Sequence, residues 1–237
     1  MRTTISYLLI YNFIMSYTYK IVQDLEKDAW NWFEACNKVG HGVDWKQRID
    51  PEIASNIAGK SKDGAYHFLI PYLADKWQND LSVSKGADYI SRRFEKCFSE
   101  ACEKLVDISG HPLYRNDFTI YLTTFPRGPY NFDQGALWVC AMWFNPIANF
   151  MHEVLHFQFI HYWRNDSSSE VSKLSDESFE ILKESLTVVL DSSLMPLIEK
   201  ADKGYDIHQE LREKLHIHWL NNRDFNSLIT YSLTLLP

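Results

Sequence analysis

The sequence predicts a helix-rich α+β protein with a small sheet near the middle of the chain. Apolar residues recur at three- and four-residue steps through residues 86–108, which is the period of a helix with one buried face. Residues 118–125 (FTIYLTTF) are rich in the β-branched and aromatic types that favour strands. Residues 136–143 (ALWVCAMW) form a continuous apolar run, as in a buried strand or the approach to a buried helix.

The segments before these central strands are predicted to be mostly helical. A strand and three helices are expected there, over residues 16–22, 24–38, 65–80 and 86–108. Gly40 ends the first of these helices and Gly110 ends the last, because glycine readily adopts the backbone conformation that terminates a helix. Residues 41–64 contain three glycines and one proline, so they are expected to be irregular.

The chain beyond the central strands is predicted to form further helices. A helix is expected over residues 146–163. Asn145 can cap this helix, and Pro146 fits its first position. This helix is apolar nearly all round and should be buried. Residues 164–173 are polar and serine-rich, as in a surface loop. Three more helices are expected: one over residues 176–191, a short one ending at Gly204 and a long one capped by Asp206.

Composition and charge narrow the class of protein. With 46% hydrophobic and 15% aromatic residues, the 237-residue chain can bury a sizeable core and is not expected to be disordered. A net charge of −7 without runs of one sign gives no reason to expect nucleic-acid binding. The four cysteines form no C-x-x-C pair, which argues against a cysteine zinc cluster. Their scatter is typical of reduced thiols, so we expect a cytoplasmic protein.

The first 15 residues are interpreted separately from the rest. Arg2 and the apolar stretch after it resemble a weak signal peptide, but Asn12 interrupts the stretch and no small-residue cleavage site follows. The stretch is too short to span a bilayer, and no other segment suggests a membrane span. Met15 is an alternative start. We therefore expect residues 1–15 to be an extra N-terminal segment or a weak signal, and residues 16–237 to form a single domain.

The residues with recognisable chemistry are His152-Glu153-Val154-Leu155-His156, an H-E-x-x-H motif. Two histidines four residues apart project from one face of a helix, so both imidazoles can reach the same zinc ion. Zinc lowers the pKa of a bound water, and Glu153 can take up the proton of that water. The alternative is a pair of hydrogen-bonded core histidines with a solvated glutamate. Because burying two histidines and a glutamate without partners is costly, the metal site is the preferred interpretation.

A catalytic zinc usually takes a third protein ligand and keeps one position open, and the predicted helix 176–191 offers three glutamates. Glu180 falls with Lys183 and Thr187 on the side of this helix that is expected to face solvent. The opposite side is the main apolar stripe, formed by Phe179, Leu182, Leu186, Val189 and Leu190.

Glu184 and Glu177 are the remaining candidates for the third ligand. Glu184 has Ile181 and Val188 three residues before and four residues after it, so it is the carboxylate most drawn toward the interior. Glu177 lies in the first turn, where an acidic residue is often simply favourable to the helix dipole. Glu184 is therefore preferred, and Glu177 is kept as the alternative.

The HEVLH motif followed by a glutamate on the next helix resembles the gluzincin branch of the zinc metallopeptidases, over residues 118–190. The resemblance implies a zincin-like fold, with an H-E-x-x-H helix, a second helix that supplies the glutamate ligand and a sheet edge that binds extended substrate. The spacing of the best-known gluzincins would suit Glu177 better than Glu184. The metzincin continuation H-x-x-G-x-x-H is missing. His161 is five residues past His156, so it should point away from the ligand face.

A gluzincin-like mechanism also requires a donor to the oxyanion that develops on the scissile carbonyl. Tyr205 and His208 are the candidate catalytic donors, although both residue types are also ordinary at the start of a helix. Arg127 and Tyr130, in the turn PRGPYN, are the candidate substrate-binding residues, and Arg127 could hold a substrate carboxylate. Such residues can equally well anchor a turn.

The leading hypothesis is a zinc-dependent hydrolase, a metallopeptidase that cleaves a peptide or protein substrate. His152, His156 and Glu184 would bind Zn²⁺, and Glu153 would act first as general base and then as general acid. One alternative is a zincin-fold binding or regulatory protein that binds zinc without turnover. The other is a structural α-rich domain without a metal.

Overall fold

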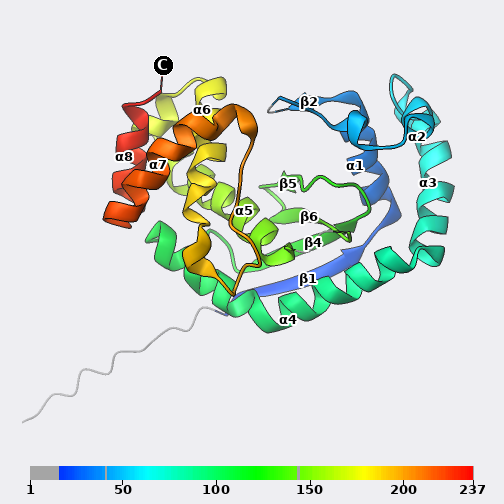
Figure 1. Ribbon diagram of the computed structural model, residues 1–237, viewed down its shortest axis with the longest axis horizontal. Coiled ribbons are helices and arrows are strands. Elements are labelled where there is room, and N and C mark those ends of the chain that lie inside the picture. The colour runs from blue at the N-terminus through cyan, green and yellow to red at the C-terminus, as the bar shows by residue number, and fades with distance from the viewer. Residues whose placement is uncertain (1–15, 41, 143–144, 237) are drawn as a thin grey trace, which may run out of the picture.

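The computed structural model describes residues 16–40, 42–142 and 145–236, and in this part the chain is a helix-rich α+β fold (Figure 1). The central sheet has the strand order β1-β4-β6-β5, in which β1, β4 and β6 are parallel and β5 is antiparallel to β6. Its strands are β1 (Thr18–Gln23), β4 (Asp117–Thr123), β5 (Tyr130–Asn131) and β6 (Ala136–Cys140). A separate antiparallel pair is formed by β2 (Val39–Gly40) and β3 (Val43–Asp44).

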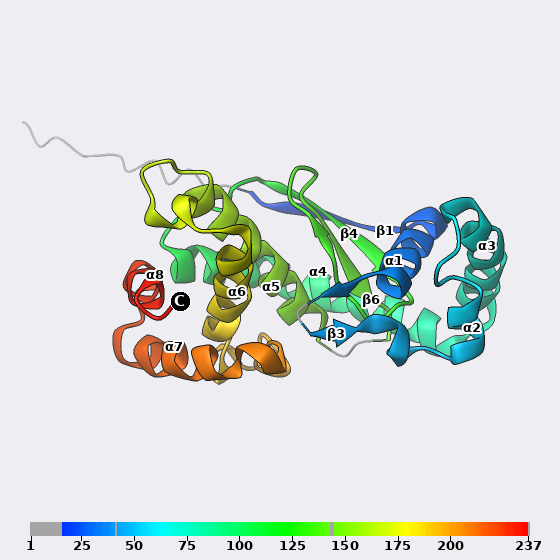
Figure 2. The same cartoon turned by 90° about the horizontal axis from the view of Figure 1, so that it is seen from above.

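Helices gather at the two ends of the molecule, with the sheet between them (Figure 2). One end contains α1, α2 and α3, and the other contains α6, α7 and α8, whereas α5 lies between the sheet and α6. The long helix α4 runs along the sheet and packs against α5. The bounds are α1 (Leu25–Asn37), α2 (Pro51–Ser55), α3 (Lys62–Asn79), α4 (Leu81–Ser109), α5 (Pro146–Phe159), α6 (Asp176–Leu186), α7 (Gln209–Asn222) and α8 (Phe225–Leu233).

The first half of the chain follows its local sequence signals closely. The predicted strand and helices appear as β1, α1, α3 and α4, with ends shifted by a few residues. Two predictions are wrong: Gly40 belongs to β2 and does not end α1, and the part of residues 41–64 that the structure describes includes β3, a 3₁₀ turn, Trp45–Arg48, and α2. Asp24 caps α1 by accepting from two backbone N–H groups, and Asp80 caps α4 by accepting from the N–H of Ser82. Gly110 ends α4 at φ 71°, a left-handed conformation that glycine adopts without a steric penalty.

Two apolar clusters form the interior. The larger one packs α4, α5, α6 and α8 against the sheet and includes the alternating residues Phe118, Ile120 and Leu122 of β4. β6 is buried throughout, as its continuous apolar run predicts. The smaller cluster joins α1 to α3, and Trp77 packs against both clusters. The cysteines are buried and unpaired, and no helix of the described residues is long and apolar enough to cross a membrane.

Two of the predicted helices are shorter than expected. The helix predicted over residues 146–163 is α-helical only to Phe159 and continues as a π-helical turn, Ile160–Arg164. The helix predicted over residues 176–191 is α-helical to Leu186 and ends in a 3₁₀ turn, Thr187–Val189. Such tighter or wider turns are common at helix ends and leave no clear mark on apolar periodicity.

The segment after residue 190 departs most from prediction. The prediction of a short helix ending at Gly204 is wrong, because only a 3₁₀ turn forms, at Ser192–Leu194. Pro196 has no backbone N–H and so cannot continue the hydrogen bonds of a helix. Asp206 does not cap α7, since it begins a separate 3₁₀ turn, Asp206–His208. The long final helix is divided at Arg223, whose φ of 50° separates α7 from α8. Residues 1–15, interpreted above as an extra segment or a weak signal, lie outside the described residues.

The buried carboxylate of Asp28 joins α1 to the end of β4. Its Oδ1 accepts from the Thr123 hydroxyl at 2.6 Å and from the Thr124 N–H at 2.9 Å. Its Oδ2 accepts from the Thr124 hydroxyl at 3.0 Å and from Trp77 Nε1 at 3.0 Å. All four partners donate, so the site is built for a group that only accepts hydrogen bonds.

Replacing Asp28 with asparagine therefore should weaken this junction. The amide NH₂ of Asp28→Asn would face donors, leaving two buried partners unsatisfied, and we expect the free energy of unfolding to fall by about 2–4 kcal/mol. Urea denaturation measures the change, with the exposed Asp133→Asn as a matched control. Equal stability of the two variants would contradict the role assigned to Asp28.

Candidate metal centre

Helix α5 presents the two histidines of the motif toward α6. Because His152 and His156 are four residues apart, their rings lie one turn from each other, with centroids 4.4 Å apart and planes at 76°. His156 is buried at 1% exposure, within a helix that is otherwise almost wholly apolar. Asn145 stands at the capping position but makes no side-chain cap. Its amide instead donates to the Lys200 carbonyl at 2.8 Å, which ties the segment after residue 198 to the start of α5.

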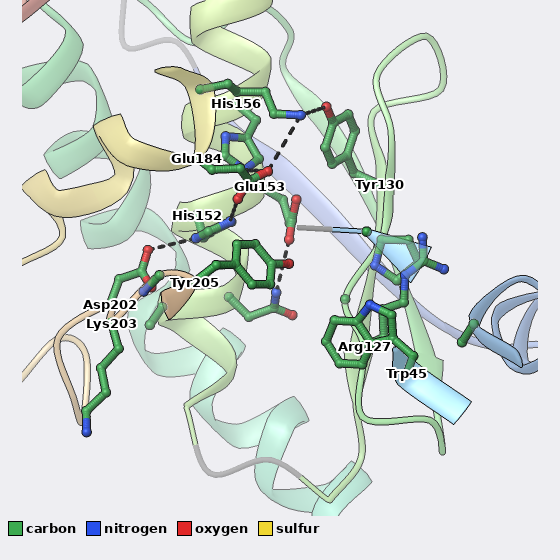
Figure 3. Close-up of a pocket in the computed structure, with 18 of the residues that line it drawn as sticks. Trp45, Arg127, Tyr130, His152, Glu153, His156, Glu184, Asp202, Lys203 and Tyr205 are labelled. Atoms are coloured by element: carbon green, nitrogen blue, oxygen red, sulfur yellow. Dashed lines mark hydrogen bonds and ion pairs between the residues drawn. The ribbon is translucent and has the colours of Figure 1, made fainter. Parts of the chain in front are cut away.

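Glu184 of α6 lies between the two imidazoles (Figure 3). One carboxylate oxygen, Oε1, is 3.3 Å from His156 Nε2, and the other, Oε2, is 3.5 Å from His152 Nε2. Two donor atoms that share a tetrahedral zinc, with bonds of about 2.0–2.1 Å, lie roughly 3.3–3.4 Å apart. The observed separations are compatible with ligands around one ion, and they are also those of direct ion pairs between the carboxylate and the two rings. Glu177, the alternative ligand, is exposed in the first turn of α6.

Glu153 belongs to the same cluster. Glu153 and both histidines each offer a ligand atom, and these atoms lie within 4.8 Å of one another. Glu153 faces the cleft, and its Oε1 accepts from Asn149 Nδ2 at 3.4 Å (Figure 3). Burial, more than any neighbouring charge, raises the pKa of Glu153 to about 8. A carboxyl group that is beside the ligands and open to the cleft is suited to proton transfer.

Two groups of the cluster, His156 and Glu184, have the protonation states of metal ligands. Burial lowers the pKa of His156 to about 3, so its imidazole is neutral, which is the form that binds zinc. Burial opposes ionisation of Glu184, but the two histidines outweigh it and hold the pKa of this carboxyl below its usual range. Within the described residues, the buried Nε2 of His156 makes no well-aligned hydrogen bond. Its contact is the ion pair with Glu184 Oε1 at 3.3 Å, and a divalent cation would add a direct bond to the nitrogen.

Asp202 orients the second histidine and was not expected from the sequence. Its Oδ2 lies 2.8 Å from His152 Nδ1, an arrangement that directs the other ring nitrogen, Nε2, toward Glu184. Burial alone would lower the pKa of His152, but the charge of Asp202 outweighs it and raises this pKa. Asp202 is in an irregular segment with no periodicity, so only its position in space reveals its role.

Arg212 of α7 was also missed, and it connects the elements that surround the cluster. Its guanidinium donates to the carbonyl of Glu184 at 2.9 Å, to the Thr187 hydroxyl at 2.7 Å and to the carbonyl of Asp202 at 2.8 Å. It is 3% exposed, so these bonds are shielded from water. One side chain therefore fixes the backbone beside both Glu184 and Asp202.

Lys183 corrects the predicted solvent face of α6. Lys183 and Thr187 were expected to face solvent together with Glu180, but Lys183 and Thr187 are both buried. Lys183 Nζ donates to the Tyr130 hydroxyl at 2.9 Å and to Glu180 Oε2 at 2.6 Å, and it lies 3.6 Å from Glu184 Oε1. The carboxylate of Glu180 and the phenol of Tyr130 give the buried ammonium group of Lys183 its partners. The predicted apolar stripe of α6 is confirmed as buried.

The cluster opens into a cleft of about 910 Å³. Tyr205, Arg127 and Tyr130, all predicted site residues, line this cleft. In Figure 3, Arg127 and Trp45 lie across the pocket from His152 and Asp202, with Glu153 and Tyr205 between them. His208 is buried outside the cleft lining, with its ring 6.2 Å from that of Tyr205. His161 is exposed and contacts Tyr114 and Tyr162, away from the cluster.

No protein-family model, curated protein or solved structure matches the chain. The fold and the cluster define an α+β protein with a group of His152, Glu153 and His156 that could hold a metal ion.

We predict that the protein binds one zinc ion through the two histidines and Glu184. The metal-stripped protein should take up about one zinc per chain, and its melting temperature should rise by roughly 5–10 °C at about 100 times Kd. His156→Ala should lose most of this zinc, as measured by elemental analysis, because one of three ligands is gone. His161→Ala is the matched control and should retain it. Equal zinc contents would contradict the site.

A second prediction concerns Asp202. Asp202→Ala should weaken zinc binding by about 10–100-fold, because His152 loses the group that fixes its ring and tautomer. Competition with a chromophoric chelator measures this affinity. The exposed Asp206→Ala, four residues further on, should bind zinc as the wild type does. An unchanged affinity for Asp202→Ala would show that the ion pair is structural only.

Proposed function

We propose that the protein is a zinc-dependent hydrolase of the metallopeptidase type, with a zincin-like active-site helix. One observation supports this most strongly. The carboxylate of Glu184 lies 3.3 and 3.5 Å from the imidazoles of α5, and Glu153, also on α5, faces the cleft. Two nitrogen ligands and one carboxylate are the donor set of a catalytic zinc that keeps a position open. His152, His156 and Glu184 would hold the ion, which when bound supplies a Lewis acid that acidifies water and polarises a carbonyl group.

Glu153 would perform the proton transfers. In this proposal Glu153, one residue after His152, keeps its carboxylate for proton transfer while Glu184 is the ligand, and Asn149 donates to one oxygen of Glu153. Burial keeps Glu153 mostly protonated near neutral pH, but the charge of a bound zinc ion would lower this pKa. The carboxylate could then accept a proton from the attacking water and deliver it to the leaving nitrogen, so that one side chain would act first as base and then as acid.

Tyr205 is the better placed of the two candidate oxyanion donors. It lines the cleft on the same side as the cluster, whereas His208 does not reach the lining. Burial, reinforced by the nearby Glu184 and Glu153, raises the pKa of Tyr205. The phenol therefore keeps its proton and can donate it in a hydrogen bond to a developing oxyanion. His208, packed against Tyr205, would position that ring.

An extended substrate could lie along β5. This strand is the last in the sheet order, so it pairs with β6 on one side only among the described strands. Tyr130 of β5 and the preceding residues Arg127 to Pro129 line the cleft. A peptide added to such an edge gains backbone hydrogen bonds that are independent of its sequence. This arrangement favours a peptide over a small-molecule substrate.

We predict that Glu153→Gln abolishes hydrolysis while zinc binding is retained. The amide cannot accept the proton of water, so kcat should fall by about 10²–10⁴-fold. Degenerate peptide mixtures incubated with the zinc-loaded protein and analysed by mass spectrometry provide the assay. Elemental analysis of the variant is the control, since a loss of zinc would explain inactivity trivially. A wild-type protein that binds zinc but cleaves no peptide would instead support a zincin-like binding or regulatory protein.

Tyr205→Phe should reduce kcat by about 10²–10³-fold with little change in KM, because the hydroxyl acts only when the oxyanion forms. The same peptide assay measures both constants. Tyr66→Phe, a change on α3 outside the cleft lining, is the matched control. An increase in KM at constant kcat would show that Tyr205 binds substrate rather than stabilises charge.

A further inference from the structure

Arg127 is placed on the cleft wall that faces the metal cluster. It follows β4 and precedes β5, and together with Trp45 it lies opposite His152 in Figure 3. Burial lowers its pKa, and the nearby groups Tyr205, Glu34 and Glu153 oppose that change. The guanidinium is thus partly withdrawn from water and lies within electrostatic range of the proposed general base.

Asn31 holds Arg127 in this position. The Asn31 amide donates to the carbonyl of Arg127 at 3.0 Å and to the Thr123 hydroxyl at 3.1 Å. Its oxygen accepts from Arg127 Nη1 at 3.3 Å. Asn31 is fully buried, and Thr123 in turn donates to Asp28. A chain of buried hydrogen bonds therefore runs from Asp28 to the guanidinium and fixes its direction before any ligand arrives.

The charge of Arg127 has no counterpart of its own. No carboxylate of the described residues lies within 4.0 Å of its guanidinium, and its one side-chain hydrogen bond goes to a neutral amide. The other partly or fully buried arginines of the described residues each have a carboxylate within 4.0 Å: Arg93, Arg115, Arg164 and Arg212. Withdrawing a cation from water without a negative group beside it is unfavourable. The position of Arg127 at a cleft wall therefore indicates a ligand that supplies the negative charge.

We propose that Arg127 binds a carboxylate of the substrate, so that the site acts on peptides with a negative charge near the scissile bond. This inference rests on the proposed hydrolase function and adds a substrate class to it. A planar guanidinium held by one nitrogen retains donors for a carboxylate, which it can bind through two parallel hydrogen bonds. The carboxylate is that of the C-terminus or of an aspartate or glutamate side chain.

The other charges of the cleft agree with a negative ligand. Of the acidic residues in its lining, Asp202 and Glu184 contact the histidines, Glu153 accepts from Asn149, Glu180 is paired with Lys183 and Glu34 with Lys38. Lys200 and Lys203 also line the cleft and are exposed, and Lys203 lies beside Asp202, opposite Arg127 (Figure 3). Both walls of the cleft therefore carry positive charge, although the whole chain has a net charge of −7.

Three degenerate pentapeptide mixtures test the proposal. They are identical except that one has a free C-terminal carboxylate, one an amidated C-terminus with a fixed glutamate, and one an amidated C-terminus with glutamine in its place. Cleavage by the zinc-loaded wild type and binding to the zinc-loaded Glu153→Gln variant are measured in parallel. We expect one charged mixture to exceed the neutral one by at least about tenfold in both, which identifies the source of the carboxylate.

Arg127→Gln should reduce that preference to the level of the neutral mixture, because the amide lacks the charge and the paired donors of the guanidinium. Arg127→Lys retains the charge but not the paired donors, so it should give an intermediate preference. This variant replaces Arg127→Gln in the test if the glutamine variant does not fold. Lys203→Gln is the matched control on the same cleft and should retain the preference. Equal use of all mixtures by the wild type, a preference that survives in Arg127→Gln, or an equal loss in Lys203→Gln would overturn the proposal.

The two readouts separate this inference from the proposed function. Preferential binding of a charged mixture that disappears in Arg127→Gln, without cleavage of any peptide, would support the carboxylate site and refute the hydrolase. Cleavage without any preference for charge would support the hydrolase and refute the carboxylate site.

Discussion

The contact of Glu184 with the two imidazoles of α5 is the constraint on which the rest of the site depends. Helix α5 is buried on nearly every side, so polar groups on it must find partners within the protein. Glu184 is the partner that α6 supplies, at 3.3 Å from one ring nitrogen and 3.5 Å from the other. This contact fixes how α6 lies on α5 and hence which face of α5 opens into the cleft.

The surrounding scaffold is organised to hold that contact. Arg212 binds backbone carbonyls beside Glu184 and Asp202, so α6 and the irregular segment after residue 198 cannot move independently. Asn145 makes a second link between the same segment and the start of α5. An irregular segment can position a charged group only when its backbone is fixed from outside, and these two side chains provide that restraint.

The sequence predicted the parts of the fold and site that have local causes. The spacing of His152 and His156 and the apolar flanks of Glu184 are properties of single helices, and the structure brings these three residues together. Asp202 and Arg212 could not be found in this way, because their roles arise from contacts between segments. Lys183 was misplaced for a related reason. Helical periodicity marks a lysine as polar, but it does not show that Tyr130 and Glu180 can accept hydrogen bonds from its buried ammonium group.

The cleft is formed by two walls that differ in origin and in chemistry. One wall comes from α5, α6 and the segment around Tyr205, and it gathers the groups suited to bond cleavage. The other comes from α1 and the turn after β4, where the network from Asp28 through Thr123 and Asn31 ends at Arg127. Because Trp77 joins the two apolar cores, the spacing between the walls is set by the packing of α3 on the rest of the molecule. The distance from a bound carboxylate to the bond that is cut would then be a property of the whole fold, not of the cleft residues alone.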